Sequence, residues 1–196
     1  MPRRIDTDER AVQIAEASLR VLERDGLAGL SVRGVAEEAN VATASLRRAF
    51  PTQHSLRVHC LELIEERATN RIRALDLTGR AFVDELLAQL LPLDRERRLE
   101  LVAQIQLGVL ALTDAELQPS ARRLNDAVDR GCRLAIDVLA EAAELEAGRD
   151  LDYEARRLRA LLDGVAMHML WSGDPDDAAR MRDTLNRHLD ELSRSA

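Results

Sequence analysis

The chain has 196 residues, and its 28 basic and 35 acidic side chains give a formal net charge of −7 at pH 7. A composition of 46% hydrophobic and 32% charged residues excludes an intrinsically disordered chain. No apolar run reaches the roughly 18 to 20 residues that a membrane span needs, and no signal peptide is expected. Two cysteines, Cys60 and Cys132, are too few for a disulfide framework, which favours buried thiols and a cytoplasmic protein. The net charge, taken alone, argues against a nucleic-acid partner.

Glycine and proline divide the chain into segments rich in Ala, Leu, Arg and Glu, which are strong helix formers. Alternating β-branched runs are missing, so we expect an all-α protein. The sequence predicts about nine helices, at residues 6–25, 31–39, 43–49, 53–76, 80–91, 94–113, 119–147, 152–172 and 176–194. Gly26 should end the first helix, Ser31 should cap the second, and Asn40 should make a left-handed turn before the third.

The two short helices at 31–39 and 43–49 form a candidate helix-turn-helix. Val35 and Ala36 are apolar, Ala39 is small enough for a close crossing, and Leu46 points into the expected core. In such a motif the second helix enters the major groove of DNA. The pattern on its own also fits a plain helical corner.

A longer stretch, residues 14–56, keeps the spacing of a larger motif. It runs from an amphipathic helix through Gly26, Ser31-Val32-Arg33, Val35-Ala36, Ala39-Asn40-Val41, Ser45-Leu46 and Phe50 to Leu56. This stretch resembles the N-terminal head of the TetR family of transcriptional regulators. The segments LLPLDRERRLE (90–100) and LLDGVAMHML (161–170) resemble the BetI-like branch of the family's C-terminal domains.

The resemblance implies a homodimeric repressor that leaves a pseudopalindromic operator when a small-molecule inducer binds. It implies a helix-turn-helix domain at residues 1–52 and a helical ligand-binding and dimerisation domain at residues 53–196. An activator of the same family remains an alternative, as does a helical small-molecule-binding or interaction protein with weakened DNA binding.

The resemblance also places DNA contacts at single residues. Arg33 matches a position that can reach a base edge, and a bidentate pair with guanine contributes about 1–3 kcal/mol of discrimination. A solvated surface arginine explains Arg33 equally simply. The family usually has Tyr, His and Lys where this chain has Arg47, Ala49 and Gln53, so we expect DNA binding with an altered phosphate pattern. The full set of expected DNA contacts is Ser31, Arg33, Thr43, Ala44, Ser45, Arg47, Arg48 and Gln53.

The net charge argues against a nucleic-acid partner, but the distribution of charge along the chain does not. Residues 1–60 hold nine arginines and eight acidic residues, so the acidity lies in residues 61–196. No acidic residue occurs between Asn40 and Leu61. Every basic residue is arginine, which suits planar recognition of guanine and phosphate.

In the larger domain, we expect an effector pocket beside polar or aromatic residues that stand in apolar stretches, although each also fits an ordinary core position. These candidates are Gln104, Gln106, Met167, His168 and Trp171. The chain has four aromatic residues, too few to predict a cage around a quaternary ammonium ion, so choline or betaine gains no support. By the resemblance, the last two helices form a four-helix bundle in the dimer. The apolar stripes expected there are Leu158, Leu162, Val165, Met169, Met181, Leu185, Leu189 and Leu192.

The sequence gives no support for catalysis. None of the motifs GxSxG, HExxH, GxGxxG or the P-loop occurs. His54 and His59 are five residues apart and do not share a helix face as metal ligands would. We therefore expect neither an enzyme nor a metal site nor a cofactor.

Overall fold

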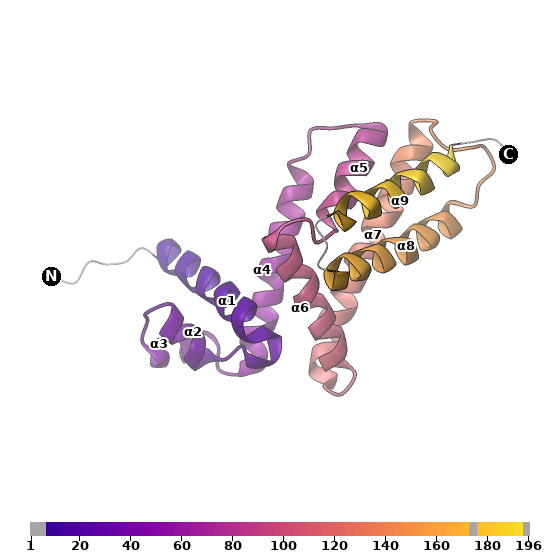
Figure 1. Cartoon of the computed structure of the whole chain (residues 1–196). Helices are drawn as coiled ribbons and strands as arrows, with labels where there is room; N and C mark the ends of the chain where they lie inside the picture. The colour runs from indigo at the N-terminus through magenta and orange to yellow at the C-terminus, as the bar shows by residue number, and fades with distance from the viewer. Residues whose placement is uncertain (1–6, 173–175, 194–196) are drawn as a thin grey trace. The chain divides into compact units, whose positions relative to one another are not determined.

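The computed structural model describes residues 7–172 and 176–193, with side chains from residue 10 onward (Figure 1). Within these ranges every regular element is a helix, which confirms the predicted all-α class. The elements in order are α1 (Thr7–Gly29), α2 (Val32–Glu38), α3 (Thr43–Ala49), α4 (Gln53–Arg73), α5 (Gly79–Gln89), α6 (Arg95–Ala111), the 3-10 turn η1 (Ala115–Leu117), α7 (Gln118–Glu141), α8 (Leu151–Ser172) and α9 (Asp177–Leu192).

The predicted helix starts and turns in the first sixty residues are confirmed. Ser31 caps α2, because its hydroxyl accepts the Gly34 N–H at 3.1 Å. Asn40 has a φ of 51° in the turn before α3. Before α4, the Thr52 and Ser55 hydroxyls each accept the other residue's backbone N–H, at 3.0 and 3.2 Å, so both side chains cap the helix start.

Two helix ends differ most from the prediction. Helix α1 runs on to Gly29, but Gly26 has a φ of 70° and a ψ of 177° and breaks it at the expected residue. Helix α7 ends at Glu141, whereas the sequence predicted an end at residue 147. There Ala143 adopts a φ of 55°, and the Glu144 N–H donates to the Leu139 carbonyl at 2.9 Å, a Schellman-type stop. This stop was missed because alanine, not glycine, takes the left-handed position.

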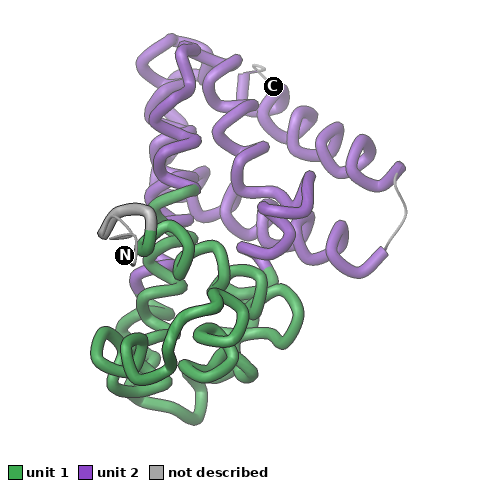
Figure 2. Tube along the Cα trace, turned by 90° about the vertical axis from the view of Figure 1, so that its left-hand side faces the viewer, with its two compact units in different colours: residues 1–67, 102–122 green, residues 68–101, 123–196 purple. Residues whose placement is uncertain are grey.

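The chain divides into two compact units, which Figure 2 colours separately. Unit 1 comprises residues 1–67 and 102–122, and unit 2 comprises residues 68–101 and 123–196. Helices α4, α6 and α7 therefore contribute to both units. The units are defined by compactness, and the domain boundary expected at residue 52 stays a prediction.

Each unit has its own hydrophobic core. In unit 1, Val21, Leu27, Val35, Leu46 and Leu56 are fully or almost fully buried. In unit 2 the core draws on α5, α7, α8 and α9. Burial of this kind contributes about 1.5–3 kcal/mol for each large apolar side chain and holds the helices in place.

The apolar stripes expected at a dimer contact lie in the core of unit 2. Seven of the eight side chains are buried within a single protomer. They are Leu158, Leu162, Val165, Met169, Leu185, Leu189 and Leu192; Met181 is half-buried. The periodicity identified an apolar face correctly, but this face packs against the protomer's own helices. The role of this stripe at a dimer contact stays a prediction.

Candidate DNA-binding site

Helices α2 and α3 form a helix-turn-helix whose inner face is buried. Val35, Ala36, Ala39 and Leu46 are each at most 1% exposed. The Val41 N–H donates to the Ala36 carbonyl at 2.9 Å and closes the turn. Because one face of α3 is fixed in this way, its opposite face is presented to solvent. Ala44, Arg47 and Arg48 are exposed on this face, and Thr43 and Ser45 are half-buried beside it.

Arg33 lies early in α2 with 81% of its side chain exposed. Its Nε donates to Glu37, one turn later, at 2.8 Å, and this carboxylate raises the pKa of the guanidinium. An exposed ion pair of this kind contributes little to stability, so a guanine or phosphate can replace Glu37 at little cost. The Arg33 side chain is thus open to solvent, and its contact with a base edge stays a prediction.

Arg47 and Arg48 lie in the last turn of α3, where cations complement the negative end of the helix dipole. The Arg48 Nε donates to the Ala44 carbonyl at a long 3.4 Å. Ser45 is already engaged, because its hydroxyl accepts from Arg10 of α1 at 2.7 Å. This bond anchors the recognition helix to α1.

The side chain of Gln53 points into unit 1. Its Nε2 donates to the carbonyls of Leu30 at 2.8 Å and Ala28 at 3.3 Å. The amide therefore holds the start of α4 against the end of α1. A phosphate contact by this side chain would require the amide to give up these bonds, whereas the N-terminus of α4 keeps its attraction for an anion.

Several contacts that shape this site were not predicted from the sequence. Arg20 and Arg24 bind Glu38 at 2.7 and 2.9 Å and hold its pKa below the ordinary value, so the acidic end of α2 is compensated. Gln13 donates to the Ala39 carbonyl at 2.7 Å and caps α2. These pairs join residues 14 to 26 positions apart, and such long-range contacts leave no periodic signal in the sequence.

The five residues expected at an effector pocket lie in different environments. In unit 1, Gln106 accepts the Leu27 N–H at 2.6 Å, and Gln104 is half-buried. In unit 2, His168 is exposed and Trp171 is 73% exposed, while Met167 is half-buried. A hollow of about 640 Å³ in unit 2 is lined instead by other side chains of α8 and α9, among them Leu161, Met181 and His188. The structure thus gives Gln106 a backbone-capping contact and leaves the pocket role of all five residues a prediction.

In residues 7–172 and 176–193, no helix combines the length and the apolar character needed to cross a membrane. The same residues contain no cluster of three or more His, Cys, Asp or Glu side chains arranged to hold a metal ion. Both cysteines are buried, and burial raises the pKa of each thiol to about 12, so neither is poised as a nucleophile.

This helical chain is similar in sequence and fold to known transcriptional regulators. Residues 79–194 match the family model described as BetI-type transcriptional repressor, C-terminal. The chain is 30% identical over 195 residues to the HTH-type transcriptional regulator PksA of Bacillus subtilis (strain 168), a match that covers 98% of this chain and 94% of PksA.

Solved structures agree with the fold. A TetR transcription regulator from Haloarcula marismortui superposes with a TM-score of 0.80 at 21% identity, covering 94% of this chain and 98% of that one. The multidrug binding protein EbrR, crystallised with imidazole, is 30% identical with a TM-score of 0.63, covering 96% of this chain and 93% of EbrR. The family model spans more than half of the chain and PksA matches almost all of it; the chain therefore belongs to the TetR family of helix-turn-helix transcriptional regulators.

Proposed function

We propose that this regulator is a cytoplasmic, homodimeric repressor that binds a pseudopalindromic operator and is released by a small molecule. The observation that carries the proposal is the outer face of α2 and α3. Arg33, Arg47 and Arg48 are exposed there, and the sequence from Asn40 to Leu61 contains no carboxylate to repel DNA. Together, a fixed recognition helix and exposed arginines meet the needs of phosphate and base contacts.

The roles of the contact residues follow from their exposure. Arg33 pairs with a guanine, Thr43, Ala44 and Ser45 face the bases or the adjoining phosphates, and Arg47 and Arg48 neutralise phosphates. Ser31 keeps its cap of α2 while its neighbours approach the backbone. Gln53 contributes chiefly by holding the start of α4, so the phosphate there meets the helix N-terminus.

For the dimer, we propose the outer face of α8 and α9. Leu161, Gly164, His168 and Trp171 recur at spacings of three and four residues and so share one face of α8. A Cβ added at Gly164 would meet nothing within 4 Å in the protomer, which leaves room for a close helix approach. The neighbouring hollow between α8 and α9 would receive side chains of the second copy.

The effector binds in the helical domain, and its chemistry is not specified by the five candidate residues. EbrR, a relative that was crystallised with imidazole, supports a small organic molecule as the class of effector. The shortage of aromatic residues argues against an aromatic cage for a quaternary ammonium ion.

The test is selection of duplex DNA from a randomised library by the full-length protein. We expect enrichment of sequences with two related half-sites, centred about 10 base pairs or a multiple of a helical turn apart. Arg33→Ala should then relax the preference at one symmetric position in each half-site, by about 1–3 kcal/mol. No enrichment by the wild-type protein would refute DNA recognition and favour the alternative of a small-molecule-binding protein with weakened DNA affinity.

A further inference from the structure

The break in α1 at Gly26 lies directly before the helix-turn-helix. Because Gly26 is left-handed, the intrahelical hydrogen-bond ladder stops there, and the Leu27 N–H needs a partner outside its own helix. Leu27 and Leu30 are both fully buried, so the segment between them is anchored by its side chains as well. Ser31, the cap of α2, follows at once.

The partner of the Leu27 N–H comes from α6. The Gln106 Oε1 accepts this N–H at 2.6 Å, across 79 residues of sequence. The approach is so close that a Cβ at residue 26 would lie 3.0 Å from both Nε2 and Oε1 of Gln106. The φ of 70° favours glycine at residue 26, and a side chain there would also press on the Gln106 amide.

Side chains of α4 donate hydrogen bonds to the backbone carbonyls that follow Gly26. Arg57 donates to the carbonyls of Leu27 at 3.0 Å and Ala28 at 2.9 Å, and Gln53 reaches Leu30 at 2.8 Å. The segment that leads into α2 is thus fixed by side chains from two other helices. Helix α4 binds carbonyl groups of this segment, whereas Gln106 of α6 binds its Leu27 N–H group.

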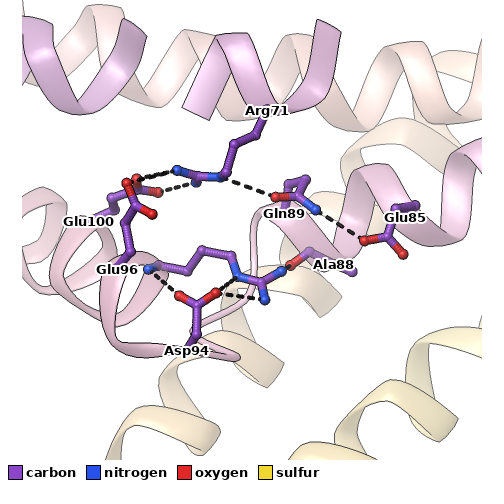
Figure 3. Close-up of polar contacts among 8 residues, drawn as sticks. Arg71, Glu85, Ala88, Gln89, Asp94, Glu96 and Glu100 are labelled. Atoms are coloured by element: carbon purple, nitrogen blue, oxygen red, sulfur yellow. Dashed lines mark hydrogen bonds and ion pairs between the residues drawn. The ribbon is translucent and has the colours of Figure 1, made fainter. Parts of the chain in front are cut away.

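Unit 2 has a polar cluster of its own, which joins its parts of α4, α5 and α6 (Figure 3). Arg71, near the end of α4, makes a bidentate ion pair with Glu100 of α6, at 2.8 and 2.7 Å. Its Nε also donates to the side-chain oxygen of Gln89 in α5, at 3.1 Å. The Glu100 side chain is only 13% exposed, so the pair is shielded from water.

From this geometry we propose that Gln106 is a positioning residue for operator recognition. By accepting the Leu27 N–H, it fixes the segment from which α2 starts and so sets where Arg33 and the side chains of α3 lie. This inference rests on the proposed operator binding and gives Gln106 a function other than contact with the effector.

The test compares three changes at Gln106 in the full-length protein. Gln106→Leu keeps the side-chain volume and removes the acceptor, Gln106→Asn keeps the amide but is too short to reach, and Gln106→Glu restores an acceptor oxygen. Val109→Ala is the control, since it truncates another side chain of α6 that is 61% exposed and has no role in the proposal. The probes are a duplex selected by the wild-type protein and a scrambled duplex of the same length.

We expect Gln106→Leu and Gln106→Asn to weaken binding of the selected duplex about tenfold, the usual consequence of leaving a buried donor unpaired. Binding of the scrambled duplex should stay within about twofold, because it depends on phosphate charge. Amide hydrogen exchange at Leu27 should accelerate at least about tenfold in both variants. Gln106→Glu should recover most of the affinity and protection, and Val109→Ala should behave as wild type.

Two results would overturn the inference. One is wild-type affinity for the selected duplex in Gln106→Asn although the Leu27 amide exchanges freely. The other is an equal loss of affinity for both duplexes, which would show a general loss of structure; thermal unfolding identifies that case, and Gln106→Asn serves if Gln106→Leu does not fold. Failure of the proposed function is distinct, because it shows in the wild-type protein as equal affinity for the two duplexes.

Discussion

The substitution Leu189→Ala tests whether the apolar stripe on α9 forms the protomer core or the dimer contact. Leu189 is 0% exposed within one protomer and belongs to the hydrophobic core of unit 2. Truncation of a fully buried leucine costs about 2–5 kcal/mol, because it removes buried methyl groups and leaves a cavity. For a chain of this length, a loss of 3 kcal/mol would lower the melting temperature by about 6–12 °C.

The assay is urea unfolding at two protein concentrations, combined with sedimentation equilibrium. The matched control is Leu112→Ala, because Leu112 is 82% exposed and the same truncation there should change the unfolding free energy by less than about 0.5 kcal/mol. We expect Leu189→Ala to lose stability while the folded protein keeps its mass. Unchanged stability together with a dimer that dissociates would refute the core assignment and return the stripe to the subunit contact.

Two further predictions concern the same unit. Burial lowers the pKa of His188 from its ordinary value of 6.5. As the pH falls, the imidazole is therefore protonated in the unfolded chain before it is protonated in the folded one. The unfolding free energy should consequently fall as the pH drops below about 6.5. The charged groups acting on this imidazole are Arg149, Glu154, Arg157 and Glu191. His188→Asn should flatten that part of the stability profile measured by urea unfolding; an unchanged slope would contradict the assignment. Ala143→Gly should raise the unfolding free energy by about 0.5–1 kcal/mol, since Ala143 has a φ of 55°, while Ala142→Gly should lower it; a loss at both positions would contradict the strain argument.

Much of the helix-turn-helix could be predicted because its determinants are local. Ser31, Asn40 and Thr52 act on backbone groups within four residues, so their roles are visible in the sequence. Helix periodicity likewise identified the apolar faces of α8 and α9. It did not reveal what covers them, because the same stripe of leucines serves a protomer core and a subunit contact equally well.

The contacts that were missed are long-range or break a local preference. Gln106 stands in an apolar stretch and suggested a pocket residue, but its bond partner lies 79 positions away at a break in α1. Gln53 suggested a phosphate contact, and only the fold shows its amide turned toward Leu30. The end of α7 was placed six residues late because tertiary structure holds Ala143 in a conformation that alanine seldom adopts.

The measurement that tests the central claim most directly is binding of the selected and scrambled duplexes by fluorescence anisotropy across a salt series. A dimer that presents Arg47 and Arg48 from each recognition helix contacts at least about four phosphates, which predicts a slope of log affinity against log salt of about −3.6 or steeper. We expect this steep slope together with at least about a thousandfold preference for the selected duplex. A flat salt dependence, or equal affinity for both duplexes, would contradict the account of this protein as an operator-binding regulator.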